Sequence, residues 1–222
     1  MLKVPAQWCV YTEKPDNTQL YTDKMNHIYT RFAKAYDGFI RIAPFWSAWL
    51  NQVLTYDLGK KVLEVSVGPG YLLTKYPETS KVYGIDYNAT MVHRAKVKEL
   101  KAGRQAKLIE GNVEAMPYPD NFFDTIVNTM AYSGYPDGDK AMSEMLRVLK
   151  PGGQILLIDY DYPSDKDVRG YLLVKFIELC GDIMKDIGKT VEGQGASYTR
   201  QVIGAYGSVQ LFDIRKQLDG IK

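Results

Sequence analysis

The sequence has few of the residues that build disulfide frameworks and metal sites. Its 222 residues include two histidines and two cysteines, Cys9 and Cys180. Two cysteines make neither a disulfide framework nor a metal-ligand spacing, so we expect no metal and interpret both as ordinary small side chains.

Long apolar runs and a strong net charge are also missing. No apolar run reaches the roughly 18 residues of a membrane span, and the N-terminus has no signal-peptide pattern. The net charge of +2 does not indicate a strongly charged partner such as nucleic acid. A basic stretch at 94–107 has no aromatic stacking partners and predicts a solvated helix face. We therefore expect a cytoplasmic protein, and 222 residues fit one domain.

The most informative stretch is a strand followed by a glycine turn, at 61–71. Its apolar run predicts a parallel strand buried on both faces, with the start of a helix after the turn. Gly68 and Gly70 let a ligand approach the backbone closely. A second short strand ends at Asp86, about 20 residues past the turn, where a carboxylate typically binds ribose hydroxyls. The glycine turn and Asp86 together predict a nucleoside-containing cofactor.

Two residues separate the possible cofactors. A dinucleotide site needs a third glycine for close helix packing, and Leu73 occupies that position. Glu64 lies on the strand before the turn, where a carboxylate would repel phosphate and suit an ammonium or sulfonium group. An NAD-dependent oxidoreductase remains an alternative, but these residues favour a positively charged cofactor.

Four segments resemble, in order, the motifs of class I S-adenosylmethionine-dependent methyltransferases. The resemblance is strongest to the small-molecule branch that modifies quinones, sterols and lipids. The signature Asn-Pro-Pro-Tyr or Asp-Pro-Pro-Tyr, which marks enzymes that methylate amino groups of nucleic acids and protein glutamines, is missing. The matching segments are 63–70, 84–91, 110–127 and 147–157.

The resemblance implies an α/β fold: a Rossmann-like, seven-stranded, mostly parallel sheet with helices on both faces and an N-terminal helical lid. We expect a single methyltransferase domain over 1–222, with 1–58 as the lid and 59–222 as the cofactor-binding core. All three tryptophans, Trp8, Trp46 and Trp49, lie in the lid segment. Its aromatic residues could pack on the sheet, line an acceptor pocket or, as an alternative, attach weakly to a membrane surface.

The resemblance also implies which residues bind the cofactor, S-adenosyl-L-methionine, whose product is S-adenosyl-L-homocysteine. Asp86 would bind ribose, Glu64 would lie near the methionyl ammonium, and Asn112 with Val113 would frame the adenine. The sequence departs from the family at Ser66, where Gly or Ala is common, and at Asn112, where Asp is common. The full expected set is Tyr36, Glu64, Ser66, Gly68, Gly70, Asp86, Tyr87, Met91, Asn112, Val113, Asn128 and Thr129.

The predicted activity is methyl transfer to a small-molecule acceptor, such as a phenol, an amine, a quinone or a lipid-like molecule. Two alternatives stay open: a protein of the same fold that binds the cofactor but catalyses another reaction, and a membrane-surface lipid methyltransferase. No catalytic base stands out, and the candidates are Tyr132, Tyr160, Asp161 and His93.

Overall fold

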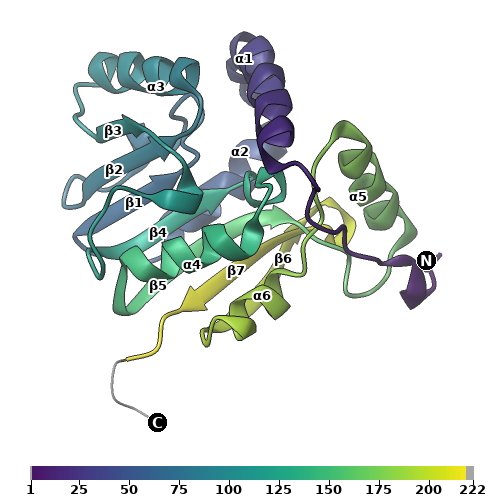
Figure 1. Cartoon of the computed structure of the whole chain (residues 1–222). Helices are drawn as coiled ribbons and strands as arrows, with labels where there is room; N and C mark the ends of the chain where they lie inside the picture. Colours follow the sequence, from purple (N-terminus) through teal and green to yellow (C-terminus); the bar gives the residue numbers. More distant parts are fainter. Residues whose placement is uncertain (1, 219–222) are drawn as a thin grey trace.

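The computed structural model describes residues 2–218, except for the side chains of 32–37 and 39–41. Seven strands form one sheet in the order β3-β2-β1-β4-β5-β7-β6, and only β7 runs antiparallel to its neighbours (Figure 1). The strands are β1 (Lys61–Val65), β2 (Lys81–Asp86), β3 (Lys107–Glu110), β4 (Phe123–Thr129), β5 (Leu149–Tyr160), β6 (Ser197–Gly204) and β7 (Val209–Arg215). This architecture confirms the Rossmann-like sheet expected from the sequence.

Helices cover both faces of the sheet (Figure 1). The buried side chains of β1 alternate between two core clusters: Leu63 and Val65 join the cluster that includes α4 and α6, and Val62 joins the cluster that includes α2 and α3. This double burial explains the apolar run of β1. The helices are α1 (Thr18–Ile42), α2 (Pro44–Asn51), α3 (Ala89–Lys101), α4 (Gly138–Val148), α5 (Val168–Cys180) and α6 (Ile187–Gly193).

The sequence predicts a short helix at 71–76, ended by Pro77, and one helix over 165–185, and the structure differs at both. The helix expected at 71–76 is a 3-10 helix of three residues, Leu73–Lys75. Gly68 and Gly70 have positive φ angles, and Pro77 follows closely, so too few residues remain for an α-helix. The helix expected over 165–185 ends at Cys180, because Gly181 takes a left-handed conformation with φ of 113°, and α6 then starts as a separate helix.

The sequence also predicts a helix capped by Asn88 and a helix that begins at Asp137, and the structure confirms both starts. The Asn88 side chain accepts a hydrogen bond from the Met91 N–H at the start of α3, and the Asp137 side chain accepts one from the Lys140 N–H at the start of α4. Both are N-caps of the kind that polar side chains favour. Within residues 2–218, none of the helices has the length and apolar character needed to cross a membrane.

The carboxylate of Asp124 fixes the start of β1 against β4. Its Oδ2 accepts hydrogen bonds from the Lys61 N–H at 2.8 Å and the Lys60 N–H at 3.1 Å, and its Oδ1 pairs with Lys150. Burial alone would raise the pKa of Asp124, but the bonds from Lys150 and these N–H groups outweigh burial and lower it. The ionised carboxylate therefore stabilises the strand that leads into the glycine turn.

We expect Asp124→Ala to lower the free energy of unfolding by about 1–3 kcal/mol at pH 7, because two backbone N–H donors, one exposed and one partly buried, lose a charged acceptor. Since the folded-state pKa is lowered, this contribution is present above the unfolded-state pKa and is lost as the pH falls through the folded-state value. Urea unfolding at pH 7 and at pH 3 measures both effects. Glu78→Ala, at an exposed position, is the control, and an equal loss at both pH values would contradict the assignment.

Candidate functional site

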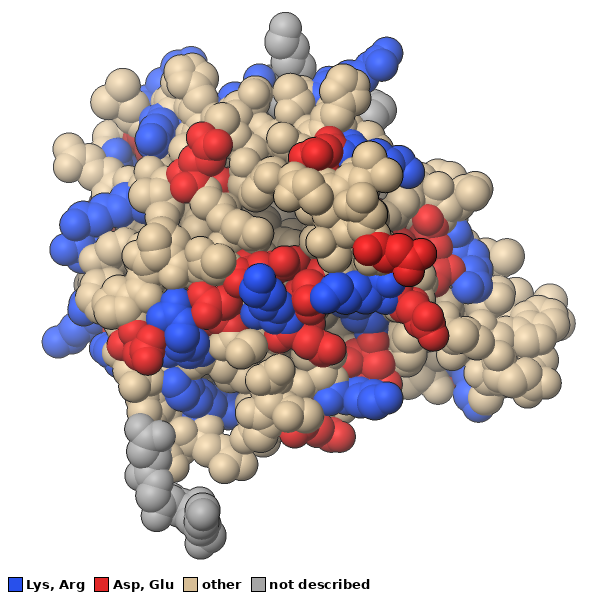
Figure 2. All heavy atoms as spheres, in the orientation of Figure 1, with Lys and Arg blue, Asp and Glu red and all other residues tan. Residues whose placement is uncertain are grey.

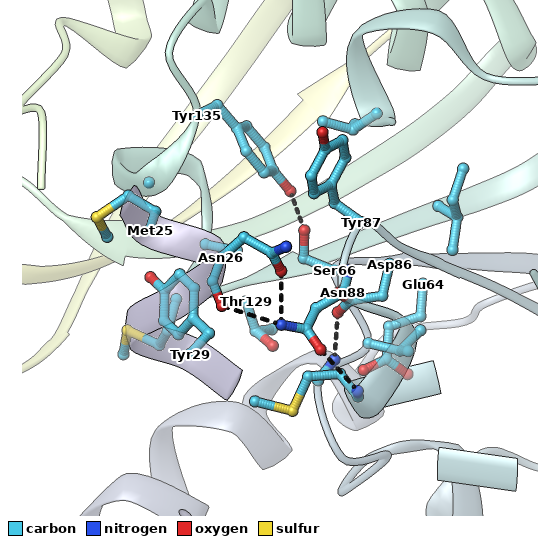
Figure 3. A pocket seen from close by; sticks show the side chains of 18 of the residues that line it. Met25, Asn26, Tyr29, Glu64, Ser66, Asp86, Tyr87, Asn88, Thr129 and Tyr135 are labelled. Atoms are coloured by element: carbon cyan, nitrogen blue, oxygen red, sulfur yellow. Dashed lines mark hydrogen bonds between the residues drawn. The ribbon is translucent and has the colours of Figure 1, made fainter. Parts of the chain in front are cut away.

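A deep cavity opens at the carboxyl ends of β1, β2 and β4, and α1 covers one side of it (Figure 3). Its empty volume is about 1200 Å³, counting the space up to its mouth. Ligands bind at this edge of open α/β sheets. Most of the expected cofactor-binding residues line the cavity: Glu64, Ser66, Gly68, Asp86, Tyr87, Met91, Asn112, Val113 and Thr129.

The turn after β1 and the carboxylate at the end of β2 are joined directly. Asp86 Oδ2 accepts a hydrogen bond from the Gly68 N–H at 2.8 Å, and Asp86 Oδ1 accepts one from the Asn88 N–H at 2.8 Å. Burial raises the pKa of Asp86 to about 6, although both N–H groups lower it in part. Gly68 has a φ of 53°, and a Cβ placed on it would meet no atom within 4 Å, so its backbone stays open to a ligand.

Glu64 is a buried carboxylate beside this turn. Its side chain is 3% exposed, and Oε2 has no hydrogen-bond partner among the described residues. Burial raises the pKa of Glu64 to about 8; the neighbouring Tyr76 hydroxyl lowers it in part, and the negative charges of Glu99 and Asp86 raise it. A buried carboxylate with an unpartnered oxygen is costly unless it is neutralised, so the position fits a cationic ligand group.

Two expected residues lie outside the cavity, and a third is not described there. A Cβ on Gly70 would meet Leu73 and Ala95, so this glycine serves the close packing of the turn on α3. Asn128 is fully buried and donates to the Tyr135 hydroxyl at 2.6 Å. Tyr36 falls in the part of α1 whose side chains lie outside the described residues.

Ser66 has a structural partner that the sequence did not reveal. It adopts a left-handed φ of 55°, which is uncommon for a residue with a Cβ. Its Oγ lies 2.8 Å from the Tyr135 hydroxyl, which also lines the cavity. Burial raises the pKa of Tyr135 above its ordinary range, so this hydroxyl stays neutral. The pair connects the glycine turn to the loop that follows β4.

Asn112 already uses its amide oxygen within the chain. Its Oδ1 accepts a hydrogen bond from the Glu114 N–H at 2.9 Å and starts the short 3-10 helix Val113–Ala115. An aspartate there would have a second oxygen free for a ligand. An asparagine in place of the aspartate common in the family therefore costs one acceptor at this end of the cavity.

One face of α1 lines the cavity, and the sequence reasoning missed it. Thr22, Met25, Asn26 and Tyr29 recur at helical spacing, and all four lie along the cavity wall (Figure 3). The signal is present in the sequence, because two polar residues share this face with Met25 and Tyr29 at helical spacing.

The candidate catalytic residues do not come together in the cavity. Tyr132 is buried, and its hydroxyl donates a hydrogen bond to the Gly138 carbonyl. Asp161 is also buried, and its Oδ1 accepts a hydrogen bond from the Tyr11 hydroxyl at 2.8 Å. His93 is exposed on α3, and Tyr160 lies outside the cavity lining. Burial holds the pKa of Tyr132 above its ordinary range. These four side chains therefore lie away from the cavity, and of the two tyrosines in the loop after β4, Tyr132 and Tyr135, it is Tyr135 that lines the cavity.

The charge of the cavity has one sign. Its described lining contains the carboxylates of Glu64, Asp86 and Glu114, and no lysine, arginine or histidine belongs to that described lining. The outer surface differs, because basic and acidic side chains are interspersed on the face shown in Figure 2. The cavity thus suits cationic or neutral ligands.

Comparison with known proteins agrees with this geometry. Residues 63–157 match the family described as a methyltransferase domain. The chain is 32% identical over 152 residues to the ubiquinone/menaquinone biosynthesis C-methyltransferase UbiE of Escherichia coli O1:K1. That match covers 64% of this chain and 61% of the relative, so the chain spans less than two thirds of the relative's length.

Two solved structures share the fold. A methyltransferase from Aquifex aeolicus that depends on S-adenosylmethionine has a TM-score of 0.63 and 24% identity, covering 82% of this chain and 96% of its own. The [4+2]-cyclase SpnF has a TM-score of 0.62 and 16% identity, covering 76% of this chain and 79% of its own. At these identities the likeness concerns the fold alone.

We expect Glu64→Gln to match the wild type in stability at pH 5 and to exceed it by about 2–4 kcal/mol at pH 9. A raised folded-state pKa means that the carboxyl contributes stability below its unfolded-state pKa, and that this contribution is lost as the pH rises through about 8. Glutamine stays neutral throughout. Chemical unfolding of both proteins across this range measures the difference, with Glu192→Gln at an exposed position as control; no difference at pH 9 would show that Glu64 titrates normally.

Proposed function

The chain belongs to the class I S-adenosylmethionine-dependent methyltransferases, whose cofactor is S-adenosylmethionine, and from this premise we propose that it transfers the cofactor's methyl group to a small-molecule acceptor. One observation carries the proposal: two buried carboxylates, Glu64 and Asp86, meet at the open glycine turn of a deep cavity. A dinucleotide phosphate would face repulsion there, whereas a sulfonium and an ammonium group would be stabilised.

The cavity residues fit this cofactor. Asp86 would accept hydrogen bonds from the ribose hydroxyls, and the unpartnered carboxylate of Glu64 would pair with the methionyl ammonium. Gly68 leaves its backbone open beside them. Met91 and Val113 would enclose the adenine, with Asn112 at its edge.

The chain's part in the reaction is positioning and exclusion of water. When bound, the cofactor supplies an activated methyl group, and displacement at that carbon needs a nucleophile aligned with the sulfur–carbon bond. Thr129 at the end of β4 and Met130 after it line the cavity, as do residues of α1. We assign 1–58 as a lid on the core 59–222, in which α1 covers one side of the cavity and α2 anchors the segment in the core cluster beside the sheet.

The acceptor is an uncharged or cationic molecule with apolar surface, such as a phenol, an amine, a quinone or a lipid-like compound. An anionic acceptor would meet the carboxylates that line the cavity, with no described cation to offset them. Met25, Tyr29 and Met130 offer apolar surface on the acceptor side. The relative UbiE is named as a ubiquinone/menaquinone biosynthesis C-methyltransferase, and quinones belong to this class of acceptors.

Attachment to a membrane through the lid tryptophans has less support. Trp46 and Trp49 pack against the core cluster beside the sheet, and the described rings of Phe45 and Trp46 both contact Trp49. Phe45 is the large apolar residue of α2 that stays exposed. A small-molecule acceptor that reaches the cavity from solution is therefore the proposed case.

The first test is calorimetric titration of S-adenosylmethionine and of NAD into the wild type and Asp86→Ala. We expect the wild type to bind the methyl donor and not NAD. The variant should lose about 10- to 100-fold in affinity, since hydrogen bonds to a charged group contribute about 1.5–3 kcal/mol each. His93→Ala, on an exposed position of α3, is the matched control.

Three results would count against the proposal. Binding of NAD would point to an oxidoreductase, and binding of neither ligand would remove the cofactor assignment. Tight binding of S-adenosylmethionine without formation of S-adenosylhomocysteine in the presence of any phenol, amine or quinone would favour another reaction on this fold. The [4+2]-cyclase SpnF is a protein of this fold named for a different reaction.

We expect Asn112→Asp to bind S-adenosylmethionine about 3- to 10-fold more tightly than the wild type. The amide oxygen of Asn112 is held by the Glu114 N–H, and a carboxylate would offer a second acceptor to the adenine amino group, worth about 1 kcal/mol. The same calorimetry measures it. An unchanged or weaker affinity would show that the adenine edge does not meet residue 112.

A further inference from the structure

We propose that Asn88 is a positioning residue that holds α1 over the cavity and couples this helix to the cofactor loop. The proposal rests on the proposed function for its catalytic consequence, but the contact itself is present in the chain without any ligand. Asn88 is 5% exposed and lies two residues after the ribose-binding carboxylate of Asp86. Its hydrogen bonds to Asn26 are drawn in Figure 3.

Asn88 uses each of its polar groups on a different element. Its backbone N–H donates to Asp86 Oδ1 at 2.8 Å, and its Oδ1 accepts from the Met91 N–H at 3.0 Å. Its Nδ2 donates to Asn26 Oδ1 and to Thr30 Oγ1, both at 2.6 Å. The Asn26 carbonyl oxygen lies 3.2 Å from the same nitrogen, so the two hydrogens of the amide face three acceptors on α1. One side chain therefore joins the cofactor loop, α3 and α1.

α1 has few other anchors among the residues described. Met25 is the only one of its described side chains that is buried, and the described members of the three core clusters include no residue of this helix. A second polar tie joins the Tyr21 hydroxyl to the Gly181 carbonyl at 2.9 Å. The described part of α1 thus buries little apolar surface, and a segment of this kind depends on such bonds for its position.

The contact lies where it can set the acceptor side of the cavity. Asn26 lines the cavity itself, and Met25 and Tyr29 lie beside it on the same helix face. A shift of α1 would move all three, whereas the glycine turn and Asp86 belong to the sheet edge. Loss of the Asn88 contact should therefore affect acceptor placement more than cofactor affinity.

Cofactor binding and helix docking should also influence each other. Asp86 Oδ1 accepts a hydrogen bond from the Asn88 N–H. A ligand that orders this carboxylate should therefore also order Asn88, the residue that holds α1. Coupling of two binding equilibria is reciprocal. The cofactor should therefore slow the opening of α1, and release of α1 should weaken cofactor binding by the same factor.

A serine at position 88 separates the two roles of the side chain. Serine is a good N-cap and can still accept the Met91 N–H, but it is too short to reach Asn26 and Thr30. Asn88→Ser thus removes the contact with α1 and keeps the start of α3. Asn88→Ala removes both.

We expect hydrogen exchange of the α1 amides around 22–30 to be roughly 10-fold faster in Asn88→Ser than in the wild type, as loss of about two hydrogen bonds predicts. Exchange in α3 should stay unchanged in Asn88→Ser and rise in Asn88→Ala. From the other side of the contact, Asn26→Ala removes one of the acceptors and should reproduce part of the loss, and Asn26→Asp, which keeps that acceptor, should retain wild-type protection. Asp23→Ala, which removes an exposed contact of Gln19 on the same helix, is the matched control and should exchange as the wild type does.

The kinetic readout distinguishes positioning from a general loss of structure. With a phenol, amine or quinone that the wild type methylates, Asn88→Ser should raise the acceptor KM or lower kcat by roughly 10-fold, while the Kd for S-adenosylmethionine changes by less than about 3-fold. Equal exchange of α1 in Asn88→Ser and the wild type would overturn the proposal. Failure of the wild type to bind S-adenosylmethionine would instead overturn the proposed function, and the exchange comparison without ligand would still decide the role of Asn88.

Discussion

The structure depends on a buried carboxylate that is held by backbone N–H groups at the edge of a parallel sheet. Asp86 receives the Gly68 N–H from the turn after β1 and the Asn88 N–H from its own loop. These bonds fix the ends of two neighbouring strands relative to each other. They also keep a negative charge where burial alone would disfavour it, as the raised pKa of Asp86 shows. The cavity is therefore formed around a buried carboxylate that a ligand could bind.

That arrangement costs stability in the absence of a ligand. Glu64 adds a second buried carboxyl group with an unpartnered oxygen, and no described lysine, arginine or histidine lines the cavity to offset either charge. Ser66 adds a left-handed backbone conformation in the same turn. Strain and unpaired polar groups of this kind gather at functional sites, where a bound ligand relieves them. The apolar core on both faces of β1 supplies the stability that tolerates them.

The sequence predicted the parts of the site that depend on local chemistry. The apolar run of β1, the glycines of the turn and the carboxylate after β2 each have a pattern that a short window contains, and the sheet followed from them. The docking of α1 could not be predicted in this way, because it depends on a hydrogen bond between the side-chain amides of Asn26 and Asn88, which are 62 positions apart. Tyr132 and Asp161 failed as candidates for a related reason: burial and local partners, which a sequence does not display, decide whether a titratable group reaches a cavity. The break after α5 was visible only as Gly181, a residue that a helix can also contain.

The departure at Ser66 shows how the two walls of the cavity are linked. A glycine or alanine there would serve the turn but would leave the Tyr135 hydroxyl with Asn128 alone. The serine hydroxyl instead joins the cofactor turn to the loop after β4. Asn88 joins the neighbouring cofactor loop to α1 itself. Both walls that would contact an acceptor are thus fixed by hydrogen bonds to the two loops that would bind the cofactor. Because transfer requires the nucleophile and the methyl carbon to be aligned, fixing both walls to the same pair of loops ties the acceptor's position to the cofactor's.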